Sequence, residues 1–279
     1  MEKLKYLTLA AASPYINRTR YIDPTKASIE RISGQKCVEE WKQEFQGKIL
    51  VSTHSHVVRV TRIAENIIGA MHTEINKMRS ISEDISQYGF VRRVWLCMTR
   101  KLPPSLSHLD ELNWEILIVT GDDVTDYFAI VCSGGKIIAS TALIELHSSD
   151  VELATMLAHE VAHIMARHGV EMCTKVELIS MIDCVLNLFV LIDFYETCEF
   201  EADYIGLLLM AAAGYDPRQA PKFYEKMTMF DEPVKFPLLA RFLDSHPSSK
   251  ERAKAVARPE IMQEALILYK DARGRRGVE

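Results

Sequence analysis

The feature that most constrains this 279-residue chain is a five-residue motif, His159-Glu160-Val161-Ala162-His163. Residues four apart lie on one face of a helix, so the two histidines can direct their imidazoles at one metal ion. Glu160 is then close enough to reach a water molecule beside that metal. Zinc lowers the pKa of a bound water, and a neighbouring carboxylate can take its proton. The motif therefore predicts a helix with a hydrolytic zinc site, in which His159 and His163 are ligands and Glu160 is the general base.

The residues around the motif favour a helix from about position 150 to position 168. Ser149 followed by Glu152 is typical of a capping box at the start, and Gly169 is expected just past the end. Apolar residues recur between these limits at helical spacing: Leu153, Met156, Leu157, Val161 and Ile164. The alternative for so short a motif is a solvated or core-edge helix with two incidental histidines.

A catalytic zinc ion usually takes three protein ligands and keeps one position open. His168 follows His163 by five residues, or about 140° round a helix, so we expect it to point away and to act as a helix-end cation or a packing residue. Glu199 and Asp203 lie four apart and share a helix face, so one can ligate zinc while the other holds a ligating histidine. Spacing alone equally allows a helix with acids on its solvent-exposed face.

The pattern H-E-x-x-H followed by E-F-x-A-D, here Glu199-Phe200-Glu201-Ala202-Asp203, resembles the membrane-associated gluzincin peptidases. These include HtpX, the CAAX prenyl proteases and the mitochondrial Oma-type metalloendopeptidases. Further segments resemble the same group, namely Ser133–Ile138, Ala166–His168, and Ser245–Ser248 with Arg252. Two early segments, Asn17–Tyr21 and Gly47–Leu50, are similar to the Oma-type branch. The resemblance covers roughly residues 17–258.

The resemblance implies a zinc-dependent metalloendopeptidase that hydrolyses peptide bonds of polypeptide substrates in protein quality control at the mitochondrial inner membrane. It implies one Zn²⁺ per subunit. By position it assigns His159, His163 and Glu199 as zinc ligands and Glu160 as the general base. It also assigns Asp203 as the acid that orients a histidine, and His246 as a hydrogen-bond donor to the oxyanion.

One segment departs from that group. Its members usually carry an N-A-F-like segment before a P-G-G turn, and the Asn helps to hold the substrate backbone. Here the aligned stretch is Phe128-Ala129-Ile130-Val131, and Ser133 replaces the Pro. The alternative function is therefore a catalytically weak or inactive binding or regulatory protein that retains a zinc site. The intact Glu160 favours an enzyme, because a purely structural zinc site needs no base.

The periodicity predicts an α+β fold, mainly helical, with a small antiparallel or mixed sheet beside the motif helix. We expect a hairpin that turns at Ser133-Gly134-Gly135, with Phe128–Cys132 as the edge that accepts an extended substrate. The expected helices are Val38–Phe45, Val57–Met78, Phe200–Ala213, Pro217–Met227 and Pro259–Tyr269, and the expected strands are Arg93–Met98, Trp114–Thr120, Tyr127–Cys132 and Lys136–Ser140. We divide the chain into an N-terminal extension (1–30), a peptidase domain (31–258), and a C-terminal helix with a basic, frayed tail (259–279).

Charge and cysteine content narrow the classes further. With 33 basic and 38 acidic residues the net charge is −5, and no part is strongly basic, which argues against nucleic acid as a partner. The six cysteines are irregularly spaced without C-x-x-C, which predicts buried free thiols rather than disulfides. Cys198 could be a fourth zinc ligand only by closing the catalytic position. His54-Ser55-His56 is more typical of capping or surface residues than of a metal pair.

The most apolar stretch, Leu178–Tyr195, contains Asp183, Asn187 and Asp193. A charged residue at the centre of a membrane span costs about 2.5–3.5 kcal/mol, so we expect a buried helix, with a helix lying against a membrane as the alternative. Met1–Ser13 lacks the features of a targeting peptide. We therefore expect neither a targeting nor a transmembrane segment in this chain. Membrane association and self-association stay open.

Overall fold

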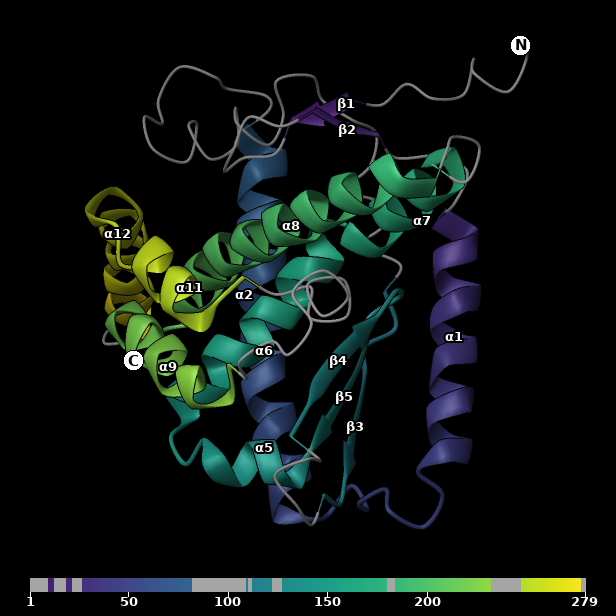
Figure 1. Cartoon of the computed structure of the whole chain (residues 1–279). Helices are drawn as coiled ribbons and strands as arrows, with labels where there is room; N and C mark the ends of the chain where they lie inside the picture. The colour runs from purple at the N-terminus through teal and green to yellow at the C-terminus, as the bar shows by residue number, and fades with distance from the viewer. Residues whose placement is uncertain are drawn as a thin grey trace.

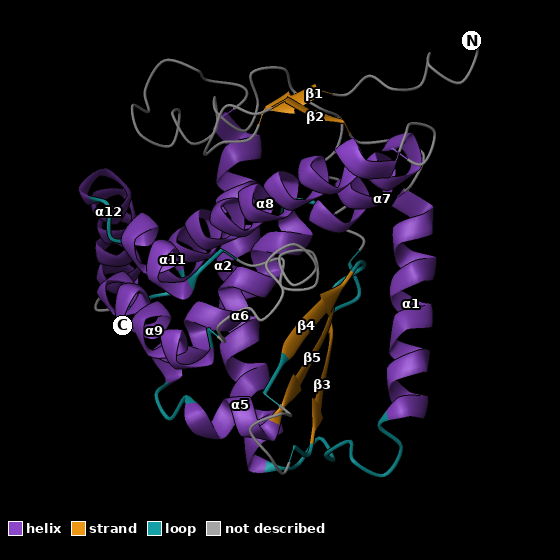
Figure 2. Cartoon of the chain, in the orientation of Figure 1, coloured by secondary structure: helices purple, strands orange, loops and turns teal. Residues whose placement is uncertain are grey.

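The computed structural model describes residues 10–12, 19–21, 27–81, 109, 112–121, 127–179, 184–231 and 247–276. These residues form a predominantly helical fold with a small three-stranded sheet on one side (Figures 1 and 2). The predicted α+β, mainly helical class is therefore confirmed. The expected strand Arg93–Met98 and the candidate residue His246 lie outside the described residues.

The sheet contains β3 (Glu115–Val119), β5 (Lys136–Ser140) and β4 (Ala129–Cys132), in that spatial order. β3 runs parallel to β5, whereas β4 is antiparallel to it. The hairpin between β4 and β5 turns at Gly134 and Gly135, whose φ values of 77° and 84° lie in the left-handed region that glycine adopts without a Cβ clash. The predicted hairpin is thus confirmed, and β4 forms an edge of this sheet.

The helical core is built from α2 (Ser55–Ile81), α6 (Asp150–Met165) and α8 (Cys184–Ala212), which cross beside the sheet in Figure 1. Ser149 caps α6 as predicted, since its side chain accepts a hydrogen bond from the Glu152 N–H. Gly206 of α8 lies directly against the motif, because a Cβ there would be 3.0 Å from the His159 nitrogen. The missing side chain lets α8 approach α6 closely enough to contribute to one site.

The remaining elements surround this core. They are β1 (Ala10–Ala12), β2 (Thr19–Tyr21), α1 (Ala27–Glu44), α5 (Thr141–Leu146), α7 (His168–Ile179), α9 (Ala220–Met227), α11 (Ser249–Val256), α12 (Pro259–Arg276), and two 3-10 turns at Pro217–Gln219 and Thr228–Phe230. α1 packs Val38 and Trp41 against the sheet. The helix begins well before the predicted Val38. The sequence did not indicate this first half, because Gly34 and the exposed Ile32 leave it without apolar periodicity.

The end of α6 differs from the prediction. The helix stops at Met165, and Arg167 adopts the left-handed conformation (φ 56°) that was expected at Gly169. Arg167 is buried and forms a two-pronged ion pair with Glu30, at 3.1 Å to Oε1 and 2.6 Å to Oε2, which holds this conformation. Gly169 therefore lies in the first turn of α7, and α6 and α7 are separate helices.

The prediction of buried free thiols is wrong for three described cysteines. Cys37 of α1 and Cys132 of β4 form a disulfide, and Cys173 is exposed, whereas Cys198 is a buried free thiol. The disulfide partners are 95 residues apart in the sequence. Irregular spacing could not reveal this pair, because only the packing of α1 on the sheet brings the two residues together.

The structure also differs from the predictions for the basic C-terminal tail and for the most apolar stretch. The C-terminal tail does not fray where expected, since α12 continues to Arg276, and Arg275 bonds to Asp271 at 2.9 Å within the helix. The stretch Leu178–Tyr195 is divided between the end of α7 and the start of α8, with residues 180–183 outside the described part. None of the described helices has the length and apolar character that crossing a membrane requires.

Candidate metal centre

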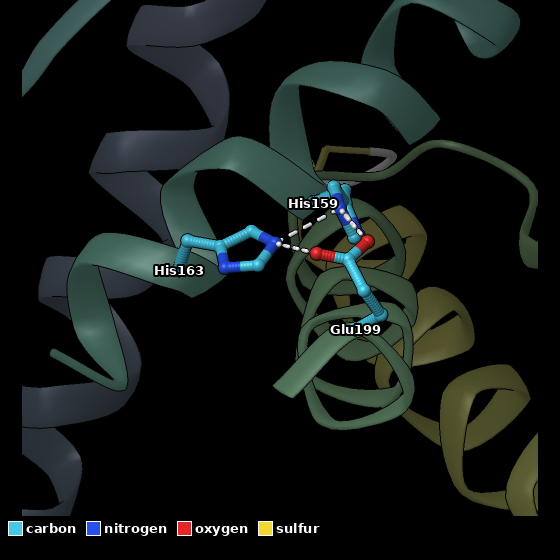
Figure 3. Close-up of side chains that lie close together, drawn as sticks. All are labelled: His159, His163 and Glu199. Atoms are coloured by element: carbon cyan, nitrogen blue, oxygen red, sulfur yellow. Dashed lines mark hydrogen bonds and ion pairs between the residues drawn. The ribbon is translucent and has the colours of Figure 1, made fainter. Parts of the chain in front are cut away.

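Three side chains from α6 and α8 converge on one point beside the sheet. His159 and His163 project from consecutive turns of α6, and Glu199 reaches them from α8 (Figure 3). Glu199 Oε2 is 3.3 Å from His159 Nε2, and its Oε1 is 3.2 Å from His163 Nε2. Among the described residues, no second group of three histidine, cysteine or acidic side chains converges in this way.

The donor set fits a catalytic zinc ion. Two imidazole nitrogens and one carboxylate oxygen lie within 4.8 Å of one another, and this combination is typical of zinc sites that keep a position open. Each histidine directs Nε2 at the shared point, while Nδ1 faces another protein group. The site can therefore hold a metal ion without rearrangement of either ring.

A buried polar network holds His159. Its Nδ1 lies 2.9 Å from Asp203 Oδ1. Asp203 also accepts hydrogen bonds from the Tyr224 hydroxyl at 2.5 Å and from Arg252, at 2.6 Å from Nη2 and 2.9 Å from Nε. Because α6, α8, α9 and α11 each supply one member, the network fixes the ring relative to four helices.

The charges of this network shift its pKa values strongly. Burial and the Arg252 guanidinium lower the pKa of His159, but Glu199 and Asp203 outweigh them and raise it to about 9 in the metal-free protein. Burial disfavours the charged Asp203 carboxylate, yet Arg252 and His159 hold its pKa well below the usual range. The pKa of Glu199 is likewise lowered, because the two histidines outweigh its burial. The centre thus holds two ionised carboxylates, and a cation that binds there takes the place of the His159 proton.

The Nδ1 atom of the other ligand, His163, faces His168 rather than a carboxylate. The two Nδ1 atoms are 2.9 Å apart, and His168 Nε2 lies 3.4 Å from Glu201 Oε2. The expectation that His168 points away is wrong, because α6 ends before it and the turn at Arg167 brings its ring back toward His163. Glu201, two residues after Glu199 on α8, faces His168.

A cavity of about 250 Å³ adjoins the metal centre. Its wall includes His163 and Glu199 from the ligand set and Val131 of the edge strand β4. Apolar side chains supply much of the rest, among them Leu112, Ile164, Met172 and Phe194. The cavity therefore connects the metal centre to the strand that was predicted to receive substrate.

The other candidate residues are placed as follows. Glu160 follows His159 on α6 and is half-buried. The backbone N–H of His56 donates to His54 Nδ1 at 3.2 Å, in agreement with the capping interpretation of this pair. The sequence analysis assigned no role to Tyr224 or Arg252, although Arg252 belongs to one of the segments that resemble the gluzincin peptidases.

Comparison with known proteins agrees with this geometry. A model of peptidase family M48 matches residues 97–196 and 184–260, more than half of the chain. The chain belongs to peptidase family M48. It is 33% identical to the mitochondrial metalloendopeptidase OMA1 of Arabidopsis thaliana, over 95% of this chain and 64% of the relative. The matches to Saccharomyces cerevisiae and Homo sapiens OMA1 are 26% and 24% identical, over 91% of this chain each and over 70% and 46% of the relatives.

The family assignment confirms the resemblance that the sequence motifs indicated. It also implies a metal cofactor and polypeptide substrates, as expected for a family of metallopeptidases. The chain spans less than two thirds of the plant relative and less than half of the human one.

Proposed function

We propose that this chain is a zinc-dependent metalloendopeptidase that binds one Zn²⁺ through His159, His163 and Glu199. The observation that carries the proposal is the convergence of both Nε2 atoms and the Glu199 carboxylate on one point, with a second acid next to a ligand. The relatives named as metalloendopeptidases support the same activity.

Glu160 is the proposed general base. It follows His159 on α6 and is therefore displaced by about 100° around the helix axis, so it borders the metal centre without being a ligand. When bound, zinc would polarise the scissile carbonyl and lower the pKa of the attacking water. Glu160 takes one proton from that water as the new C–O bond forms, and delivers it to the leaving amine as the C–N bond breaks. We propose that His246 donates to the oxyanion, and that Asp203 orients His159.

The edge strand β4 is the proposed site for the substrate backbone. The Ser140 N–H donates to the Phe128 carbonyl at 3.1 Å, so the backbone groups of Phe128 face β5. Because this direction alternates along a strand, the backbone N–H and C=O groups of Ala129 and Val131 face the open edge. An extended polypeptide can bond to these backbone groups as an added strand. Val131 also lines the cavity beside Glu199, so a bound chain would place one side chain in a largely apolar pocket.

We place this activity in mitochondrial protein quality control, by the names of the relatives and by the resemblance to the Oma-type branch. The inner membrane is the proposed site of action on the same resemblance. A polypeptide that has lost its fold is the substrate class that suits an edge strand, because only an extended chain exposes its backbone for pairing.

One observation favours a second candidate, a zinc-containing binding protein with weak or no activity. The strand segment Phe128–Val131 departs from the family pattern, and the Cys37–Cys132 disulfide ties this strand to α1. Such a protein would bind extended chains at β4 and release them uncut.

The experiment that separates the two candidates is cleavage of an unfolded test protein, such as reduced and alkylated casein, by the purified zinc-loaded chain. We expect fragments with zinc, none after chelation, and fragments again when zinc is restored. If the chain binds both zinc and casein but leaves the casein intact, the proposed enzyme activity is wrong and the binding protein is favoured.

A further inference from the structure

We propose that His168 and Glu201 act together as a positioning pair that fixes the orientation and tautomer of the ligand His163. The inference rests on the proposed metal site, but concerns two residues to which neither the motif nor the family match gives a role. Both side chains are buried, with 5% of His168 and none of Glu201 exposed, so bulk water does not compete for their polar atoms.

The geometry requires His163 to carry its proton on Nδ1. Its Nε2 lies 3.2 Å from Glu199 Oε1 and therefore faces the metal point. An imidazole that gives the Nε2 lone pair to a metal is neutral and keeps its hydrogen on Nδ1. That Nδ1–H needs an acceptor, and the atom 2.9 Å away is His168 Nδ1.

His168 can accept this hydrogen bond only in one tautomer. Its Nδ1 must present a lone pair, so its proton must be on Nε2. The Nε2 atom lies 3.4 Å from Glu201 Oε2, and an ionised carboxylate is an acceptor only. As a carboxylate, Glu201 selects the tautomer of His168 that can accept a hydrogen bond from His163. The chain of contacts runs from Glu201 through His168 to His163 and the metal point.

The other ligand, His159, is supported by a carboxylate directly. His159 has its Nδ1 2.9 Å from the Asp203 carboxylate, without an intervening ring. Each ligand histidine is thus supported by a carboxylate, one directly and one through His168. The turn at Arg167 makes the second support available, because it ends α6 and returns the next residue toward His163.

The sharpest test compares two amides at position 168. The Asn side-chain oxygen can take the place of imidazole Nδ1 and accept from His163, whereas the Gln side chain reaches the place of Nε2. We expect His168→Ala and His168→Gln to weaken zinc binding 10- to 100-fold in chelator competition, as is typical when the partner of a ligand histidine is lost. His168→Asn should recover most of this loss. The visible spectrum of the Co²⁺-substituted protein should be perturbed in the Ala and Gln variants and close to the wild type in Asn.

Glu201→Leu tests whether the two residues act in series. It should weaken zinc binding in the same direction, and the double variant with His168→Ala should bind zinc no more weakly than His168→Ala alone. Independent, additive losses would contradict a series and overturn the proposal.

His147 offers a matched control, since it is a fully buried histidine that bonds to the Tyr127 hydroxyl and not to the metal ligands. His147→Asn should lower the free energy of unfolding and leave zinc affinity unchanged. Equal zinc affinity in His168→Ala and wild type, or equal losses in His168→Asn and His168→Gln, would overturn the positioning role. If zinc affinity follows the prediction while even the wild type cleaves nothing, the proposed function fails and the positioning pair stands.

Discussion

His159 at the metal centre and His147 beside the start of β4 are both buried, yet their pKa values move in opposite directions. The pKa of His159 rises to about 9, because Glu199 and Asp203 outweigh burial and the nearby Arg252. The pKa of His147 falls to about 4, because burial outweighs the single carboxylate of Glu152. On the helical side, charges of both signs therefore compensate one another around one point. On the sheet side, burial dominates at His147, beside Tyr127 just before β4.

This difference indicates two kinds of recognition in one molecule. The metal side is prepared for a cation by carboxylates that are already ionised and held in place. The sheet side offers backbone groups of β4 next to a cavity that Val131 lines, which suits an extended chain of varied sequence. Changes on the two sides should consequently have different effects.

The largest effect should come from removing the third ligand. Glu199→Ala deletes the carboxylate that both histidines face, so we expect zinc affinity to fall by more than about 100-fold, beyond the loss typical of supporting residues. Cleavage should disappear with the metal. Metal content after dialysis against a weak chelator measures this, with the exposed Glu225→Ala on α9 as the control. Retention of zinc by Glu199→Ala would remove this residue from the ligand set.

The next effect concerns the stability of the charged network. Arg252→Met leaves the buried Asp203 carboxylate without its guanidinium, which should cost about 3–5 kcal/mol of unfolding free energy in the metal-free protein. Adding Asp203→Asn should restore part of this loss, because the uncompensated charge is gone.

Arg218 provides the control for this experiment, since it pairs with Asp216 at the surface at 2.6 Å. Arg218→Met should have a much smaller effect in the same urea titration, because solvent screens an exposed ion pair. Similar losses at the buried and the exposed arginine would contradict the claim that Arg252 compensates a buried carboxylate.

A smaller effect should appear in the acid stability of the sheet side. The folded pKa of His147, about 4, lies below its unfolded value of about 6.5, so the unfolded state binds more protons between these pH values. His147 should therefore reduce the free energy of unfolding as pH falls from about 6.5 to 4, by up to about 3 kcal/mol.

The measurement is the difference in unfolding free energy between wild type and His147→Gln across this pH range, because other titrations cancel in the difference. The wild type should lose stability relative to the variant as pH falls. A constant difference would show that His147 does not titrate as its burial requires.

The smallest effect should come from the backbone of the edge strand. Val131→Pro removes an N–H that points to the open edge, where proline is tolerated in a sheet. Loss of one substrate hydrogen bond worth about 0.5–1.5 kcal/mol should raise KM roughly 3- to 10-fold with zinc retained. Val131→Ala keeps the N–H and is the matched control. Equal KM values for the two variants would argue against strand addition at β4.

The three proposed ligands do lie together, and their proximity was predictable because the sequence signals are local. The i, i+4 spacing of His159 and His163 decides their face on α6, and the family resemblance selected Glu199 over Asp203 as the third ligand. The hairpin was also predictable, since Gly134 and Gly135 occupy the two positions that need left-handed backbone.

Features that depend on tertiary packing were missed. His168 was expected to point away, because helix periodicity cannot anticipate the turn at Arg167, which an ion pair with Glu30 holds from across the fold. The Cys37–Cys132 disulfide was missed because its partners meet only when α1 packs on the sheet. The first half of α1 was missed because few of its residues contribute to the core.

The most direct test of the central claim, that Glu160 is the base of a zinc peptidase, is casein cleavage by the Glu160→Gln variant. Glu145→Gln on α5, an exposed acid, is the control. We expect Glu160→Gln to bind zinc as tightly as the wild type and to cleave at least about 100-fold more slowly, because proton transfer by a positioned group contributes this much or more. Wild-type rates of cleavage by zinc-loaded Glu160→Gln would contradict this expectation.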